Sequence, residues 1–166
     1  CARVIATSPA VSLYHGRVNG RRFVQMAGIG FDARVVADVT PRLKRGLGRF
    51  AYVFLTLRGL FRYRLPRFAI EIDGVAYEAS SVVIAKGHFY GGRFSCTPEA
   101  RPDDPCLHIC LFEQGGSWNV LRYSFGLLCG RLAHYPDVRI VTGRRIHVEG
   151  LTGEPVQADG DIVASL

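Results

Sequence analysis

The chain has 166 residues, of which 48% are hydrophobic and 21% are charged, a balance typical of one folded domain with its own core. This composition excludes a disordered chain, and no apolar run reaches the roughly 18–20 residues that a membrane-spanning helix needs. The formal net charge is +7. Five cysteines without a CxxC pair favour free thiols in a reducing cytoplasm over a disulfide framework. Because the chain begins CARVIATSPAV, with neither an initiator methionine nor a signal-peptide pattern, we expect it to be part of a longer protein.

The first half of the chain predicts a β-hairpin followed by helical segments. Asn19-Gly20 separates two strand-like runs, SLYHGRV and RFVQMAGI, and Asn-Gly supplies the positive φ angles of a two-residue hairpin turn. A helix is predicted to begin near Phe31 in FDARVVADV and to break at Thr40-Pro41. The helical pattern resumes from about Leu47 to Tyr63.

The positive charge is concentrated between Arg42 and Arg67, a segment with eight basic residues and no acid. On a helical wheel the apolar residues of this segment form one arc with arginines on both sides. The pattern fits a helix on an anionic membrane surface, and it also fits a helix that packs its apolar arc on a sheet. Nucleic acid is not expected as a partner, because no strand interleaves arginines with aromatic residues and no nucleic-acid-binding motif is present.

The second half predicts strands around one further helix. Asp73-Gly74 marks a second hairpin turn. A helix is predicted from Ser117 to His134, with Ser117 as its N-cap and Pro136 ending the region. Further strands are predicted in SSVVIAKG, CLHICLF, VRIVTGRRIHVEG and PVQADGDIVASL, and the short gaps between them favour antiparallel pairing. The predicted fold is mainly β (α+β): a single domain over residues 1–166, built as an antiparallel β-sandwich with two helical insertions.

Cys106, His108 and Cys110 alternate in CLHIC and would share one face of a strand. Three such side chains could bind zinc. The alternative is a strand face packed inside the protein, where a free cysteine behaves as a small apolar residue. The absence of a second ligand pair in the sequence favours the packed face.

Two pairs of acids are candidates for chemistry. Asp103-Asp104 stands between two prolines at the last bend before a strand, where a carboxylate and nearby backbone carbonyls could hold Mg²⁺. Asp159 and Asp161 flank a glycine near the other end of the chain; Asp161 could accept a hydroxyl proton while Asp159 helps to place a cation or phosphate. Both places are also ordinary turn sequences, and the residues alone leave the two interpretations open.

Four segments in order carry a more specific signal: FVQMAGIGFDARVV, KRGLGRFAYV, YGGRF…PEARPDDPCLHICLF and PVQADGD. Together they resemble the C-terminal domain of the bacterial diacylglycerol-kinase-like lipid kinases, which are relatives of sphingosine and ceramide kinases. The resemblance covers nearly the whole chain and implies a β-sandwich. In that family ATP binds largely to a separate N-terminal α/β domain with a Gly-Gly-Asp-Gly-Thr motif, which this sequence lacks. The resemblance therefore implies that the nucleotide-binding domain is absent from this chain.

The resemblance also implies a set of site residues. Asp104 would be the magnesium-linked carboxylate, with the backbone carbonyls of Arg101 and Cys106 as the nearby oxygens. Asp161 would match the catalytic acid of the family, and Asp159 would be its neighbour in the motif.

Three positions depart from the family pattern. The catalytic position is usually Glu, and Asp161 is shorter by one methylene, a difference in reach of roughly 1.5 Å. Pro105 stands where the family commonly has Gly, and Gln25 stands where Asn is often found.

The activity implied by the resemblance is ATP-dependent phosphorylation of a lipid hydroxyl such as that of diacylglycerol. This chain would be the substrate- and metal-binding domain of that kinase, with Mg²⁺ and ATP as cofactor and co-substrate, and would be inactive alone. The expected partners are the lipid substrate, ATP and an anionic membrane surface at the inner face of the cytoplasmic membrane, which the segment from Arg42 to Arg67 is expected to contact. A homo-oligomer is left open. The alternatives are a non-catalytic lipid- or ligand-binding sandwich, a basic nucleic-acid-binding module, or a kinase with a soluble acceptor such as NAD.

Overall fold

The computed structural model describes residues 7, 9, 12–38, 66–90 and 92–166. The helical pattern predicted from about Leu47 to Tyr63, and the break at Thr40-Pro41, lie outside the described residues. Most of the basic segment from Arg42 to Arg67 also lies outside them. Among the described residues, no helix has the length and apolar character needed to cross a bilayer.

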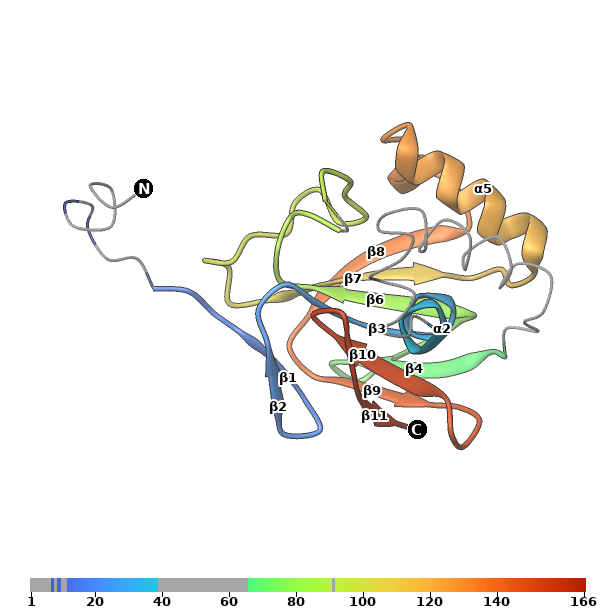
Figure 1. Cartoon of the computed structure of the whole chain (residues 1–166), viewed down its shortest axis with the longest axis horizontal. Helices are drawn as coiled ribbons and strands as arrows, with labels where there is room; N and C mark the ends of the chain where they lie inside the picture. Colours follow the sequence, from blue (N-terminus) through green and yellow to red (C-terminus); the bar gives the residue numbers. More distant parts are fainter. Residues whose placement is uncertain (1–6, 8, 10–11, 39–65, 91) are drawn as a thin grey trace.

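The predicted antiparallel β architecture is confirmed (Figure 1). The largest sheet has the strand order β11-β10-β3-β6-β7-β8. Its strands are β3 (Met26–Ile29), β6 (Ser81–Ala85), β7 (Leu107–Phe112), β8 (Val138–Gly143), β10 (Pro155–Ala158) and β11 (Asp161–Ser165). A second sheet has the order β5-β4-β9, and β1 pairs with β2 as a separate hairpin. These strands are β1 (Gly16–Val18), β2 (Arg21–Phe23), β4 (Phe68–Ile72), β5 (Val75–Ala79) and β9 (Ile146–Glu149).

The hairpin turns form where the sequence predicts them. Asn19 has φ 45° between β1 and β2, and Asp73 has φ 48° between β4 and β5. Asp159 has φ 50° between β10 and β11, and each of the three is followed by a glycine with positive φ. Asparagine and aspartate tolerate this left-handed conformation better than most residues, which explains their place in these turns.

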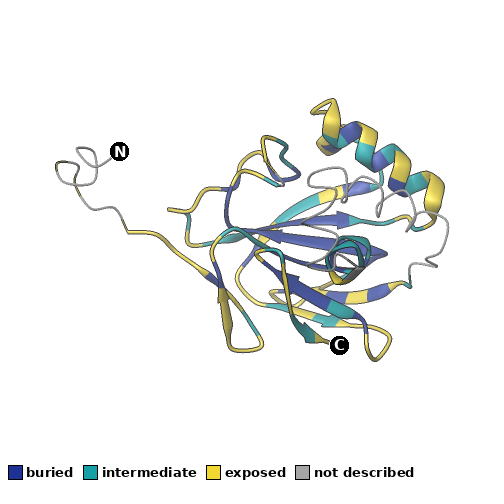
Figure 2. Ribbon diagram, in the orientation of Figure 1, coloured by how far each residue is buried: buried dark blue, intermediate teal, exposed yellow. Residues whose placement is uncertain are grey.

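The main core lies between the large sheet and the sheet of β4, β5 and β9. Strand β4 alternates buried and exposed residues, so Phe68, Ile70 and Ile72 point into this core. Strand β6 is buried at all five residues, because Val82 and Ile84 join the main core while Val83 joins a second cluster under α5. Figure 2 shows this buried centre and the exposed outer faces of the β1–β2 hairpin and α5.

The sheets are accompanied by helix α2 (Phe31–Asp38), helix α5 (Ser117–Leu128) and a short 3₁₀ turn, η1 (Leu132–His134). The prediction of one helix from Ser117 to His134 was wrong in two respects. Gly116 is the N-cap and Ser117 is the first helical residue. The helix ends because the N–H of Gly130 bonds to Leu127 and that of Arg131 bonds to Gly126, and these two bonds with Gly130 at φ 66° form a Schellman cap.

Candidate functional site

The two acid-bearing turns lie at the same end of the six-stranded sheet. Ala158 of β10 pairs with Ala27 of β3. Ala27 pairs with Ile84 of β6, which in turn pairs with Ile109 of β7. The turn after β10 and the loop before β7 therefore leave the sheet on the same side, three strand intervals or roughly 14 Å apart.

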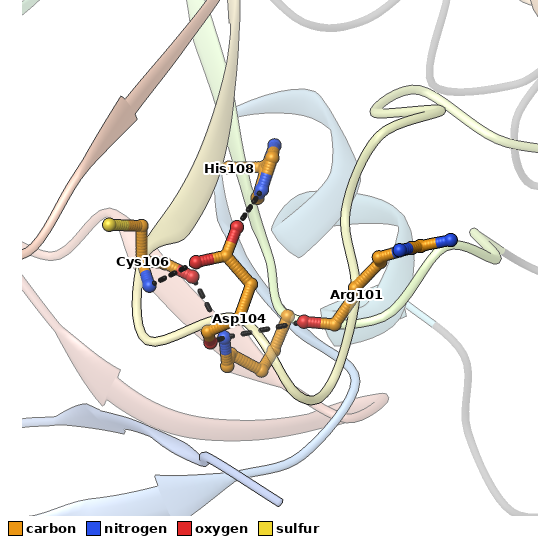
Figure 3. Close-up of polar contacts among 5 residues, drawn as sticks. Arg101, Asp104, Cys106 and His108 are labelled. Carbon is orange, nitrogen blue, oxygen red and sulfur yellow. Dashed lines mark hydrogen bonds and ion pairs between the residues drawn. The ribbon is translucent and has the colours of Figure 1, made fainter.

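Asp104 is the centre of the loop that precedes β7 (Figure 3). Its Oδ1 accepts the backbone N–H of Cys106 at 2.8 Å, and its Oδ2 lies 3.0 Å from Nε2 of His108. The N–H of Asp104 donates to the carbonyl oxygen of Arg101 at 3.2 Å. The hydrogen bond from Cys106, followed by that with His108, holds the pKa of Asp104 below its ordinary value. The carboxylate is therefore charged at neutral pH and tied to its own loop.

Lys86 follows β6 directly, and its side chain ends inside the same loop. The residue is only 1% exposed. Its Nζ donates to the carbonyl oxygen of Cys106 at 2.8 Å and faces that of Arg101 at 3.5 Å, and it also donates to the carbonyl oxygen of Asp104. Burial lowers the pKa of Lys86, and the charge of Asp104 opposes that shift. We call these three carbonyl oxygens the carbonyl nest.

The resemblance predicts that Mg²⁺ binds to Asp104 and to the carbonyl oxygens of Arg101 and Cys106. In the structure the Lys86 ammonium group lies beside these carbonyl oxygens. Both carboxylate oxygens of Asp104 also have partners. Magnesium needs oxygen ligands at about 2.0–2.1 Å, which would place it against the ammonium group. The residues present do not fit a magnesium ion here, and across the described ranges no group of three or more His, Cys, Asp and Glu side chains could hold a metal.

The Asp159 carboxylate joins its turn to the chain between β2 and β3. Its Oδ2 accepts the N–H of Val24 at 2.8 Å, and its Oδ1 accepts those of Gln25 at 2.9 Å and Met26 at 3.0 Å. The N–H of Asp159 donates to the carbonyl of Met26 at 2.8 Å. RFVQMAGI, predicted as one strand, is accordingly divided here into β2 and β3. Both oxygens of a carboxylate expected to help place a cation or phosphate thus bind backbone.

Asp161 is in a different situation, although only one glycine separates it from Asp159. It is the first residue of β11, pairs with Ala158 across the hairpin, and is exposed. Within the described part of the chain, its carboxylate has no hydrogen-bond partner. Of the two acids in the turn, Asp161 is therefore the one whose carboxylate is not engaged by the described residues.

Gln25 connects the two turns, a role that the sequence did not indicate. Its carbonyl oxygen accepts the N–H of Lys86 at 2.9 Å and that of Gly87 at 3.1 Å, and its side-chain amide donates to the carbonyl of Phe89. A Cβ at position 87 would lie 2.6 Å from Oε1 of Gln25, so Gly87 permits this close approach.

A buried polar cluster beside this end of the sheet was also missed. The carboxylate of Asp32 accepts a hydrogen bond from Nε2 of Gln157 at 2.6 Å and another from the Tyr90 hydroxyl. Burial raises the pKa of Asp32 and, more strongly, that of Tyr90. The available signals were an acid in the first turn of a helix and a glutamine in the buried strand β10.

The zinc interpretation of CLHIC gains no support. His108 faces Asp104, whereas Cys110 lies in the apolar cluster with Val83 and Tyr123. Burial raises the pKa of Cys110 to about 12, so its thiol stays neutral. The packed-face alternative describes Cys110 correctly.

Comparison with known proteins gives consistent results. Residues 25–166 match the family described as the YegS C-terminal NAD kinase beta sandwich-like domain. A Pseudomonas fluorescens (strain Pf-5) protein named "Probable lipid kinase YegS-like" is 32% identical over 163 residues, covering 91% of this chain and 53% of that protein. A protein of Bacillus subtilis (strain 168) named "Diacylglycerol kinase" is 24% identical over 148 residues, covering 88% of this chain and 48% of that protein.

The fold is also found in a solved structure. A diacylglycerol kinase from Bacillus anthracis (strain Sterne) superimposes with a TM-score of 0.70 at 24% sequence identity, over 99% of this chain and 54% of that one. The chain thus spans about half the length of the curated relatives it matches, at 53% and 48%.

Proposed function

Because the chain belongs to the YegS C-terminal NAD kinase beta sandwich-like domain family, we propose that it is the substrate-side domain of an ATP-dependent lipid kinase. The kinase would transfer the γ-phosphoryl group of ATP to a lipid hydroxyl such as that of diacylglycerol. The observation that carries this proposal is the similarity, over 91% and 88% of the chain, to proteins named lipid kinase and diacylglycerol kinase.

Asp161 is the proposed general base. The lipid hydroxyl oxygen would bond to the γ-phosphorus, the bond from that phosphorus to the bridging oxygen of ADP would break, and the hydroxyl proton would pass to the Asp161 carboxylate. Support comes from its exposure and from the lack of a competing hydrogen bond among the described residues. Asp159, whose carboxylate binds backbone, is proposed as a positioning residue that fixes the turn carrying Asp161.

Magnesium enters this proposal as part of the co-substrate. ATP is used as its magnesium complex, in which the ion neutralises charge on the phosphate oxygens. The nucleotide would bind mainly to a separate domain of the parent protein. No step of the proposed reaction needs a metal ion in the carbonyl nest.

Membrane association is proposed through one face of α5. Trp118, Leu121, Phe125 and Leu128 are 74%, 45%, 64% and 62% exposed. Their spacing of three or four residues puts them on one face of the helix. Exposed aromatic and aliphatic side chains along one helix face suit contact with a bilayer surface, where the acceptor lipid resides. The kinase would thus work at the inner face of the cytoplasmic membrane.

The decisive experiment measures lipid phosphorylation by the intact protein that contains this chain. Asp161→Asn keeps the size of the side chain but removes the base, and it should lower kcat by about 10²–10⁴-fold. The matched control is Glu149→Gln, which neutralises an exposed acid on the other sheet and should leave kcat unchanged.

Unchanged turnover in Asp161→Asn would remove Asp161 from the mechanism. If the intact wild-type protein phosphorylates no lipid, that result would support the alternative of a non-catalytic lipid-binding sandwich. Phosphorylation of NAD instead of lipid would assign a soluble acceptor.

A further inference from the structure

We propose that Lys86 is a built-in cation: its ammonium group takes the place of a divalent metal ion in the carbonyl nest, and this chain therefore holds its Asp104 loop without a metal. The inference concerns the architecture of the loop and does not depend on which reaction the protein catalyses.

The hydrogen-bonding capacity of the lysine matches the nest. An ammonium group has three N–H donors and no acceptor. Lys86 faces three backbone carbonyl oxygens, those of Arg101, Asp104 and Cys106. A side chain that is 1% exposed has little access to water, so its charge needs such partners. The nest provides one oxygen for each donor.

The negative charge that a metal would need is present and already used. Asp104 lies in the same loop, and its charge favours the protonated form of Lys86. Its two carboxylate oxygens bind the N–H of Cys106 and the ring of His108. The loop therefore contains a cation, an acid and a full set of hydrogen bonds without any added ion.

The backbone fixes the lysine in this place. The N–H of Lys86 donates to the carbonyl of Gln25 at 2.9 Å, and the residue directly follows β6, the strand buried on both faces. On the outer side, the ring of Tyr14 lies 5.7 Å from Nζ, and the N–H of Tyr14 bonds to the carbonyl of Pro102 at 2.8 Å. The ammonium is thus enclosed between the end of β6, the loop and an aromatic ring.

The nest excludes a second cation while the lysine is present. A magnesium ion bonded to these carbonyls at about 2.0–2.1 Å would be in van der Waals contact with the ammonium, with no water between the two charges. Metal binding and lysine binding are therefore alternatives at one set of oxygens. Removing the amine should leave a nest of carbonyls beside a charged Asp104, which is a suitable environment for a divalent ion.

The first test is thermal unfolding of the intact protein without nucleotide, in EDTA and then with Mg²⁺ or Ca²⁺. Lys86→Asn should lower Tm in EDTA by several degrees, because the carbonyl oxygens and Asp104 lose their cation. Added divalent ion should restore much of that loss, because it binds the folded form. The control is Arg17→Asn, which removes an exposed positive charge from strand β1 and should behave like the wild type.

A variant that melts like the wild type in EDTA, or one that loses stability but does not respond to Mg²⁺ or Ca²⁺, would overturn the inference.

A second measurement tests the inference if Lys86→Asn fails to fold. The native wild-type protein is treated with an amine-acylating reagent and Lys86 is monitored by mass spectrometry. Lys86 should react only after unfolding, with equal protection in EDTA and in millimolar Mg²⁺ or Ca²⁺. Labelling that appears when either ion is added would mean that the ion displaces the lysine.

Discussion

The carboxylate of Asp159 accepts the backbone N–H of Gln25 at 2.9 Å, although 134 residues separate them in the chain. The carbonyl oxygen of Gln25 accepts the N–H of Lys86, and the Lys86 ammonium binds the loop of Asp104. A continuous series of hydrogen bonds therefore links the two acid-bearing turns across the end of the sheet. The turns are mechanically connected even though their carboxylates do not meet.

This linkage makes Asp159 a residue whose loss should affect stability more than its exposure suggests. Asp159→Asn keeps a residue that tolerates φ 50° but removes a charged acceptor of three backbone N–H groups. We expect a loss of about 1–3 kcal/mol in the free energy of unfolding. Urea unfolding measures it, with Asp161→Asn as the matched control, expected within about 0.5 kcal/mol of wild type. Equal losses in the two variants would contradict the structural role of Asp159.

Asp161→Glu tests the proposed base from the opposite direction. The substitution keeps the carboxylate and extends the side chain by one methylene, roughly 1.5 Å. Glu is the usual residue at the matching position of the lipid kinases that the sequence resembles. Lipid phosphorylation by the intact protein should therefore remain within about tenfold of wild type, whereas Asp161→Asn should lose about 10²–10⁴-fold. A Glu variant as inactive as the Asn variant would argue that Asp161 has a role other than proton acceptance.

Gly30, between β3 and α2, is predicted to tolerate no side chain. It has φ +92°, and an added Cβ would lie 2.8 Å from the carbonyl oxygen of Ser80. Gly20 has φ +84° with nothing within 4 Å of an added Cβ. Gly20→Ala should cost about 1–2 kcal/mol from the backbone conformation alone, and Gly30→Ala should cost a further 1–3 kcal/mol or so from overpacking. Chemical denaturation of both variants measures the difference, and equal costs would contradict it.

Asp73 should contribute to the acid sensitivity of the fold. Backbone N–H groups of Arg145 and Arg144 bind its carboxylate, each at 2.9 Å, and hold its pKa below the ordinary value. Because the pKa is lower in the folded protein, this stabilisation is complete above about pH 4 and is lost as the pH falls through the folded value. Asp73→Asn should therefore be less stable than wild type at pH 7, with a difference that shrinks in acid. A difference in unfolding free energy that stays constant into the acid range would refute this.

The exposed face of α5 gives a prediction for membrane binding. Replacing Phe125 and Leu128 together by Ser removes two exposed apolar side chains and should weaken flotation with anionic phosphatidylglycerol vesicles. Val75→Ser is the control, because Val75 is 54% exposed but belongs to β5 in the other sheet. Binding that the double variant retains in full would place the membrane contact elsewhere, with the basic segment from Arg42 to Arg67 as the next candidate.

Short-range patterns carried the fold prediction. Alternation located the strands, and Asn-Gly and Asp-Gly located the hairpin turns, because a turn depends on the few residues that form it. The end of α5 was misplaced, although Gly130 was a visible signal, because the apolar pattern continues beyond it into Leu132. The N-cap was assigned to Ser117 because serine is a common cap, whereas the chain uses Gly116 at φ 92°.

The candidate site could be predicted only in part, for a physical reason. Asp104 and Asp161 are visible as acids in turns, and the resemblance gave them roles that remain predictions. Lys86 was not visible, because a lysine after a buried strand normally reaches solvent, and its carbonyl partners are backbone atoms that no side-chain pattern reveals. Asp32 and Gln157 were missed for a similar reason, since they are 125 positions apart and meet only in the folded sheet.

The pairing of β3 with β10 has a consequence for how the chain acquires its shape. Strand β3 (Met26–Ile29) lies between β6 and β10, so one of its edges gains a neighbour only when residues 155–158 have been synthesised. During synthesis, the backbone N–H and C=O groups of that edge stay unpaired until most of the domain has been made. Such an unpaired edge can pair with strands of other chains. Contacts of such long sequence separation also slow folding. The hairpin of β10 and β11 is therefore the last part of the large sheet to be synthesised, and the acid turn that it carries can take its place only after that synthesis.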